Sequence, residues 1–152
     1  AAGNVTSMSF PGLDGNATNG YYLVGNIDSN FNGSNNYLLY VNGDTTDTNY
    51  RMQYLAARAT STFLDRVSNP SVANTQDLTG THFAYYVSRD TNGHFRFSGM
   101  YQRENDTLLI GVTQWGIRSA GTIANITSLQ VNSQNASGIG DGSRVSLYAF
   151  TL

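Results

Sequence analysis

Residues 115–152 read WGIRSAGTIANITSLQVNSQNASGIGDGSRVSLYAFTL and hold two runs with the composition of β-strands. The runs are Ala124–Val131 and Ser143–Thr151, and the stretch Ser137–Gly142 between them contains three glycines. Glycine adopts positive φ without a steric penalty, so this stretch predicts a tight reversal or a bulge. Because strand side chains alternate, one face of the second run is apolar, formed by Val145, Leu147 and Ala149. The segment is predicted to close a β-sheet, and we see no catalytic motif in it.

The composition of the whole chain favours the same class. Strand-forming tyrosine (10 residues) and phenylalanine (7) are common, and turn-forming glycine (16) separates them. There is one glutamate and no lysine, so residues that favour helix interiors are scarce. With 152 residues the chain is long enough to bury one hydrophobic core. We predict a single all-β domain over residues 1–152, with an antiparallel sandwich, a jelly roll or a barrel as its form.

The charge and cysteine content argue against several classes of partner. The net charge is −2, and all eight basic residues are arginines spread singly along the chain, which does not favour nucleic-acid binding. The absence of cysteine leaves no disulfide and no thiolate metal site. No apolar run approaches the roughly 20 residues that span a bilayer, so membrane insertion is not expected.

Turn signals divide the chain into about nine strands of ordinary length. One of them, Tyr50–Thr62, is ambiguous, because Arg51–Ala59 also has helix propensity, but the alternation of its aromatic and apolar side chains favours a strand. Residues 64–80 are predicted to form the longest irregular connection. The other expected strands are Val5–Phe10, Tyr21–Ile27, Tyr37–Val41, His82–Arg89, His94–Tyr101 and Leu108–Val112.

Several short motifs follow one another in a characteristic order. They are Phe10 with Gly12–Gly15 and Tyr21, Val41–Asp44 with Asn49 and Tyr50, Trp115, Ile126–Leu129, and Gly142–Tyr148. In this order and spacing the chain resembles a recurrent family of virion proteins of tailed bacteriophages. The resemblance covers most of the chain and is weakest from Thr60 to Tyr101, where we expect any specific binding role to lie.

The resemblance implies a jelly-roll β-sandwich on the surface of a virion, without enzymatic activity. For this chain it indicates a capsid-decorating or accessory protein that binds the major capsid protein or a tail protein and forms a homo-oligomer. The alternative is a receptor-binding tail-fibre or tail-tip domain that recognises a host surface glycan. The family is mostly structural, so no catalytic residues carry over, and no cofactor is implied.

The residues themselves give little sign of catalysis or metal binding. Glu104, the single glutamate, lies among polar residues typical of an exposed turn. His82 and His94 flank a hairpin and could approach one another, but two histidines without a third ligand make a weak metal site. Asp14 and Asp44 lie in turn sequences that explain them without calcium. We therefore predict neither an enzyme nor a metal site.

Tyrosines are the best candidates for a ligand or interface surface. Of the adjacent pairs at residues 21–22 and 85–86, one member each must point outward from its strand. An exposed tyrosine can stack on a sugar or pack against a protein. We select Tyr22, Tyr86 and Tyr101 as candidates, whereas Trp115 is predicted to be a core or packing residue.

Three arginines are candidates for ion pairs between subunits, because arginine suits carboxylates at interfaces. They are Arg58, Arg118 and Arg144.

Overall fold

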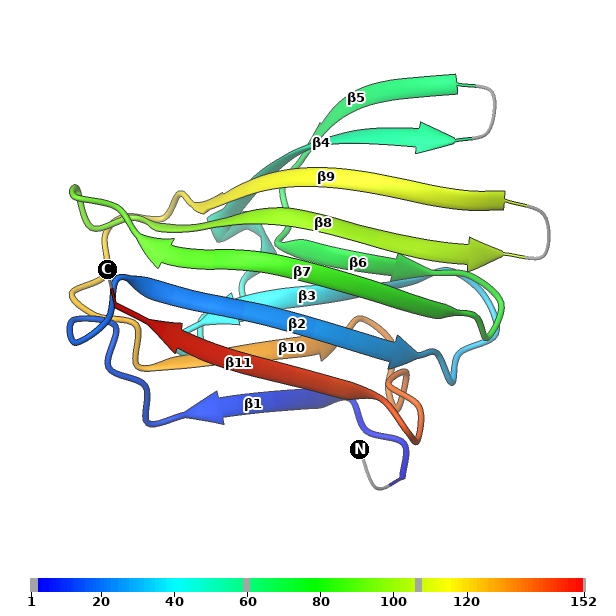
Figure 1. Ribbon diagram of the computed structural model, residues 1–152, viewed down its shortest axis with the longest axis horizontal. Coiled ribbons are helices and arrows are strands. Elements are labelled where there is room, and N and C mark those ends of the chain that lie inside the picture. The colour runs from blue at the N-terminus through cyan, green and yellow to red at the C-terminus, as the bar shows by residue number, and fades with distance from the viewer. Residues whose placement is uncertain (1–2, 59–60, 106–107, 152) are drawn as a thin grey trace.

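The computed structural model describes residues 3–58, 61–105 and 108–151, which form two antiparallel β-sheets packed face to face (Figure 1). The large sheet has seven strands, in the order β11 (Arg144–Phe150), β2 (Gly20–Asp28), β7 (Gly80–Arg89), β8 (Phe95–Asn105), β9 (Leu108–Arg118), β4 (Tyr50–Arg58) and β5 (Ser61–Val67). The small sheet has four, in the order β1 (Ser7–Pro11), β10 (Ser128–Ser133), β3 (Asn35–Val41) and β6 (Ser71–Thr75). The predicted antiparallel β-sandwich is confirmed.

The core lies between the two inner faces, as expected of a sandwich. Alternate residues of β2, β7 and β8 point into it from the large sheet, and those of β3 and β10 from the small sheet. Its largest fully buried apolar side chains are Tyr37, Tyr50, Tyr85, Phe95, Phe97, Leu23, Ile27, Leu39, Ile126, Leu129 and Ile139. One continuous cluster therefore joins the sheets.

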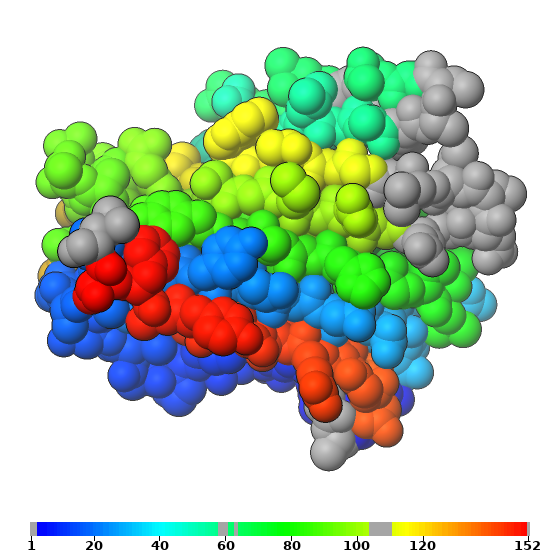
Figure 2. Space-filling view, viewed as in Figure 1, coloured from blue at the N-terminus to red at the C-terminus, as the bar shows by residue number. Residues whose placement is uncertain are grey.

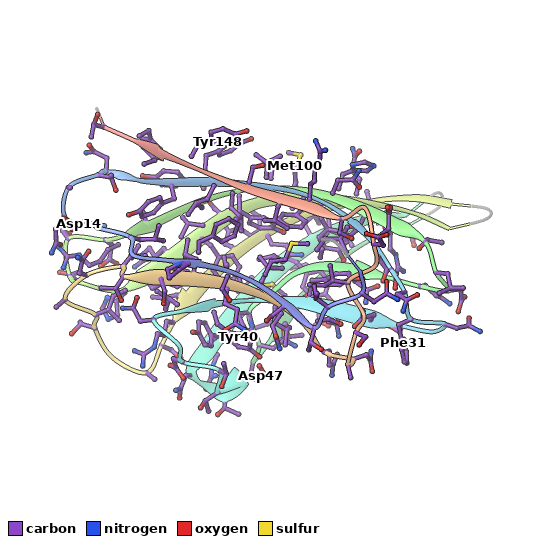
Figure 3. The ribbon with its side chains drawn as sticks, turned by 90° about the horizontal axis from the view of Figure 1, so that it is seen from below. Asp14, Phe31, Tyr40, Asp47, Met100 and Tyr148 are labelled. Carbon is purple, nitrogen blue, oxygen red and sulfur yellow. The ribbon has the colours of Figure 1, made fainter. Side chains whose placement is uncertain are left out.

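Strand β3 is buried on both faces, as its unbroken apolar run predicts. The face that points away from the core is covered by the following segment, which contains the short 3-10 turn η1 (Asp47–Asn49). Tyr40 donates a 2.5 Å hydrogen bond to Asp47, and its ring meets that of Tyr50 at 5.8 Å (Figure 3). Burial raises the pKa of Tyr40, and the hydrogen bond to Asp47 raises it further. Burial also raises the pKa of Tyr50, to about 12.

The Asn42-Gly43 turn after β3 holds distant parts of the chain together. Both residues have positive φ, 53° and 75°. The Asn42 side-chain oxygen accepts hydrogen bonds from the backbone N–H groups of Thr127 (2.8 Å) and Ser128 (3.2 Å), at the start of β10. An asparagine side chain here replaces the strand partner that these two N–H groups lack.

A second group of contacts surrounds Asp44. Its carboxylate accepts hydrogen bonds from Asn49 Nδ2 at 3.0 Å and from Arg118 Nε at 2.7 Å. Tyr50 Oη donates to the Asp44 carbonyl at 2.8 Å. Burial alone would raise the pKa of Asp44, but the hydrogen bonds from Asn49 and Arg118 outweigh it, so the pKa is lowered.

Three predicted boundaries and the strand count are wrong. Tyr50–Thr62 is not one strand, because β4 ends at Arg58 and β5, which begins at Ser61, pairs back against it. Residues 64–80 are not one irregular connection, because β5 pairs with β4 and β6 pairs with β3, which gives eleven strands in the described part of the chain. The turn-forming residues lie at the strand ends, with Pro70 directly before β6. The run Ala124–Val131 becomes a strand only at Ser128, since its first residues lack a neighbouring strand.

The glycine-rich stretch at residues 137–142 is not a tight reversal between paired strands. Strands β10 and β11 belong to different sheets, and the loop between them crosses from one to the other. Ile139 at its centre is fully buried and bridges to Val5 and Ser29. The glycines beside it allow close approach: a Cβ on Gly138 or Gly140 would lie 2.2 Å from Ser133 Oγ or 2.7 Å from the Asp28 carbonyl oxygen.

Acid is expected to destabilise the fold. The pKa values of Asp14, Asp44, Asp90 and Asp141 are lowered by hydrogen bonds, and that of Asp90, which accepts from the His94 backbone and from Arg96, falls to about 2. A group with a lower pKa in the folded state stabilises it above its unfolded pKa of about 4 and loses that effect as the pH falls. We expect denaturant titrations to give constant stability from neutral pH to about pH 5 and a decline below about pH 4. A stability that rose on acidification would contradict this assignment.

Candidate functional site

The large sheet is wider than the small sheet that covers it. Strand β6, the edge of the small sheet, lies against β7 and β8. Beyond it, β9, β4 and β5 extend past the small sheet as an overhang (Figure 1). In the part of the chain that the structure describes, no second sheet lies against the inner face of this overhang, and a cleft opens between it and the edge of the small sheet.

The cleft has a volume of about 250 Å³ and mixed polar and apolar walls. The overhang contributes the aromatic ring of Tyr54 and the buried side chain of Gln114, and the neighbouring strand β8 contributes the ring of Tyr101. The opposite wall comes from the edge of the small sheet and the segment before it. The lining residues are Asn36, Met52, Tyr54, Ala56, Val67, Asn69, Ser71, Asn74, Tyr101, Arg103, Val112 and Gln114.

A hydrogen-bonded group closes one end of the cleft and joins the two sheets. Asn74 Nδ2 donates to Asn36 Oδ1 at 2.9 Å and to the Asn35 carbonyl at 3.2 Å. Arg103 Nη1 of the large sheet donates to Asn74 Oδ1 of the small sheet. These contacts fix two amides and a guanidinium at the wall of the cleft.

Gln114 is the unusual residue of this site. Only 2% of its surface is exposed, and its Oε1 is buried without a hydrogen-bond partner among the described residues. A buried amide oxygen left unpaired is costly, so most such atoms in proteins have a donor. Its place in the cleft wall makes the cleft the direction from which a donor could come.

The second candidate surface is the outer face of the large sheet, which is the face seen in Figure 2. The strand register places Tyr148, Tyr22, Tyr86, Ser98 and Trp115 in one row across five neighbouring strands. Figure 3 shows Tyr148 and Met100 on this side, opposite Tyr40 and Asp47. The large apolar side chains exposed here are Tyr22, Leu55, Leu64, Tyr86, Met100, Trp115 and Tyr148.

Arginines lie around Trp115 on the same face. A shallow hollow of about 360 Å³ is lined by Arg51, Arg66, Arg96 and Trp115. Arg96 is paired with Asp90 at 2.6 Å, and Arg51 donates to the carbonyls of residues 48 and 50. Apolar and aromatic groups bordered by arginine make this surface chemically distinct from the polar loops.

The predicted tyrosines are divided between these two surfaces. Tyr22 and Tyr86 point outward from the large sheet, while their neighbours Tyr21 and Tyr85 are buried. The Tyr86 ring meets that of Phe150 at 5.1 Å. Tyr101 instead lines the cleft from β8, on the inner face of the large sheet. The alternation of side chains along a strand thus identified the outward tyrosine of each pair. It did not show which candidate tyrosines lie on the outer face and which line the cleft.

The predicted arginines also differ in their surroundings. Arg144 is exposed at one end of the outer face and lines a hollow with Met100 and His82. Arg118 is mostly buried and has its carboxylate partner, Asp44, within the same chain, so its burial requires no second subunit. The side chain of Arg58 lies outside the described residues.

The structure keeps His82 and His94 apart. His82 pairs with Gln102, whereas His94 directly precedes the start of β8, so the two histidines lie at opposite ends of the hairpin. Within residues 3–58, 61–105 and 108–151, no group of three or more His, Cys, Asp or Glu side chains could hold a metal ion. The side chain of Glu104 lies outside the described residues.

Trp115 is not a core residue, contrary to the prediction. Half of its surface is exposed, because Gly116 and Gln114 on either side of it face inward. Gly116 must face inward, since the ring of the buried Phe97 occupies the space that a side chain there would need. Alternation places Thr113, Trp115 and Ile117 on one face of β9 but does not say which face is outside, so the sequence held no signal for the exposure of Trp115.

No family model, curated protein or solved structure matches the chain. Among the described residues, the helical segment is the three-residue 3-10 turn η1. No helix in this part of the chain is long and apolar enough to cross a membrane. The cleft and the outer face are therefore the features on which a function can be built.

Proposed function

We propose that this chain is a surface protein of a tailed-phage virion that attaches to another protein of the particle through the outer face of its large sheet. The observation that supports attachment is the composition of that face. Tyrosine, tryptophan, methionine and arginine are the residues enriched where proteins bind one another. Seven strands spaced by ~4.8 Å give a face about 30 Å wide, on the scale of a standard protein interface.

The strand order supports the jelly-roll form that the resemblance implies. Without the β8–β9 hairpin and β11, the two sheets read β1-β10-β3-β6 and β2-β7-β4-β5. Each sheet then has four strands, and the chain passes repeatedly from one to the other, as in the double-sheet, Greek-key arrangement of a jelly roll. We infer an eight-stranded jelly roll in which the β8–β9 hairpin has been inserted between β7 and β4.

The motifs behind the resemblance lie at structural positions. Asn42, Asp44 and Tyr50 tie the end of β3 to the start of β10 and to the large sheet. Asp14 accepts a hydrogen bond from Asn125 at 3.0 Å, and the buried Ser143 donates to the Asp28 carbonyl at 3.3 Å. Shared motifs that hold a sandwich together are compatible with a family of structural proteins whose binding surfaces vary.

The partner that best fits the outer face is an apolar surface bordered by carboxylates. The described charged side chains of this face are Arg51, Arg66, Arg144 and Arg96 with its partner Asp90, and Asp28 lies at the end of β2. Two copies placed face to face would bring like charges together, which is unfavourable. An acidic major capsid or tail protein would instead form ion pairs around a central cluster of aromatic side chains.

Attachment is expected to fail when Trp115 and Tyr22 are both changed to serine. Both side chains are about half exposed and lie outside the core, so the variant is expected to fold with little loss of stability. Loss of two central aromatic groups is expected to reduce the copies per particle by about tenfold or more. The measurement is the amount of this chain on purified particles of the phage that encodes it, with Leu78→Ser, an exposed apolar residue outside the face, as the control. Wild-type occupancy in the double variant would contradict the proposal.

Cryo-electron microscopy of the same particles shows where the chain is bound and which way its large sheet faces. Regular density over the head with the large sheet facing the lattice would support capsid decoration, and density at the tail would favour the tail protein as partner. A large sheet that faces solvent would contradict attachment through it.

Light scattering of the isolated chain tests the predicted homo-oligomer. If the chain forms a dimer and a substitution of Trp115 abolishes it, the outer face binds a second copy of the chain.

A further inference from the structure

The cleft under the overhang has the chemistry of a ligand site, separate from the outer face. It combines two tyrosine rings, aliphatic walls from Met52 and Val112, and amide groups held in fixed positions. Small-molecule sites are concave, mostly apolar and furnished with a few placed polar groups. Of the residues that line the cleft, only Tyr101 and Met52 also line a hollow of the outer face described above.

The ligand must offer both hydroxyl groups and an apolar face. The buried Gln114 Oε1 lacks a donor, and the Asn36 and Asn74 amides line the same space. Tyr54 and Tyr101 supply aromatic surface against which C–H groups can pack. A sugar ring has this combination of hydroxyl edges and C–H faces.

The size of the cleft and the charge of its lining narrow the class of ligand further. A volume of about 250 Å³ lies below the range for drug-sized ligands, so the cleft suits one sugar ring and not a long oligosaccharide. The described lining has no carboxylate, and its one cation, Arg103, already donates to Asn74. We propose that the cleft binds a single neutral sugar, such as the terminal residue of a glycan, with Gln114 accepting a hydrogen bond from a sugar hydroxyl.

The origin of the cleft is consistent with a recognition role. It exists because the β8–β9 hairpin widens the large sheet by two strands and moves β4 and β5 beyond the edge of the small sheet. Without this hairpin, β4 would follow β7 directly in the large sheet, and β4 and β5 would lie two strand positions nearer to the small sheet. The same insertion brings Tyr101, Arg103, Val112 and Gln114 into the lining.

The test replaces Gln114 with methionine, which has a similar length but cannot accept this hydrogen bond. The probes are neutral hexoses, N-acetylhexosamines and deoxyhexoses, screened at millimolar concentration by saturation-transfer NMR with the full chain. We expect saturable binding of at least one of them, weakened about tenfold or more in Gln114→Met. The matched control is Gln53→Met on the outer face of β4, which should bind as the wild type does.

Stability separates a ligand contact from a merely structural role. Because Gln114→Met removes a buried oxygen that has no partner, its melting temperature should equal or exceed that of the wild type. Absence of binding to every probe, or equal binding by Gln114→Met, would overturn the proposal. If Gln114→Met does not fold, the NMR shifts of the Gln114 side-chain amide in the wild type decide: they must move on addition of the sugar, and unchanged shifts reject the site.

Each variant is expected to lose only one of the two proposed functions, virion attachment or sugar binding. The variant with serine at positions 115 and 22 should keep its sugar affinity, because both side chains lie on the outer face. Gln114→Met should keep its occupancy on particles.

Discussion

Gly116→Ala is expected to lower the melting temperature of this domain by roughly 6–12 °C. A Cβ atom on Gly116 would lie 1.9 Å from Cζ of Phe97, which is its register partner on β8. Real Cβ contacts are never this short, so the Phe97 ring would have to leave its place. That ring is 2% exposed and packs against Tyr85 and Phe95, with centroid distances of 6.0 and 6.1 Å. We therefore expect a loss of about 3 kcal/mol from overpacking, measured by calorimetry or denaturant titration.

Gly111→Ala on the same strand is the matched control. A Cβ atom there meets nothing within 4 Å, and Gly111 does not have positive φ. Alanine reduces the conformational freedom of the unfolded chain, so this variant should be neutral or more stable by up to about 1 kcal/mol. Adding Phe97→Leu to Gly116→Ala should cost less than the sum of the two single changes, because the smaller side chain removes the clash. Equal effects of alanine at positions 116 and 111 would contradict the packing argument.

The sequence was most informative where local chemistry determines the result. The unbroken apolar run Tyr37–Val41 is typical of a strand that is buried on both faces or central in a sandwich, and the structure shows it buried on both faces. The tyrosine pairs at residues 21–22 and 85–86 were divided correctly into one inward and one outward member, because alternation is a property of the strand itself. Fold class and most of the strands followed from the same rule.

The strands at residues 61–67 and 71–75 could not be found in this way. Ser71–Thr75 has a polar composition, and it is a strand because β3 offers it a hydrogen-bonding edge. The pairing of distant segments depends on the topology of the whole chain, which local patterns do not give. The loop around Ile139 was misassigned for the same reason, since its partners Val5 and Ser29 are far away in sequence.

The cleft was also beyond local reasoning. Nothing in the sequence around Gln114 shows that its inward face meets no second sheet, because that depends on the number of strands in each sheet. Trp115 was consequently given the wrong environment, because tryptophan suggests burial by composition. Only the packing of Phe97 over Gly116 establishes which side of β9 faces inward.

Arg118→Ala should destabilise the fold far more than Arg96→Ala, although each removes one arginine from an ion pair with an aspartate. The Arg118–Asp44 pair, at 2.7 Å, has side chains that are only 16% and 17% exposed. Loss of Arg118 leaves a carboxylate in that site with Asn49 as its remaining side-chain partner, and it also removes hydrogen bonds to the carbonyls of residues 120 and 121. We expect a cost of about 2–3 kcal/mol, just below the range for fully buried pairs. Arg96 is 54% exposed, so its replacement should change stability little.

The pH dependence of the Arg118→Ala effect separates the ion pair from simple loss of packing. In the wild type, the pKa of Asp44 is held below its ordinary value in part by Arg118, so the pair stabilises the fold above about pH 4 and loses this effect as the carboxylate is protonated. The difference in unfolding free energy between wild type and Arg118→Ala should therefore be largest near neutral pH and shrink below about pH 4. Denaturant titrations of both proteins across this range measure it. A difference that stays constant with pH would assign the role of Arg118 to its packing and its carbonyl contacts, and would leave the Asp44 turn held by Asn49 and Tyr50 alone.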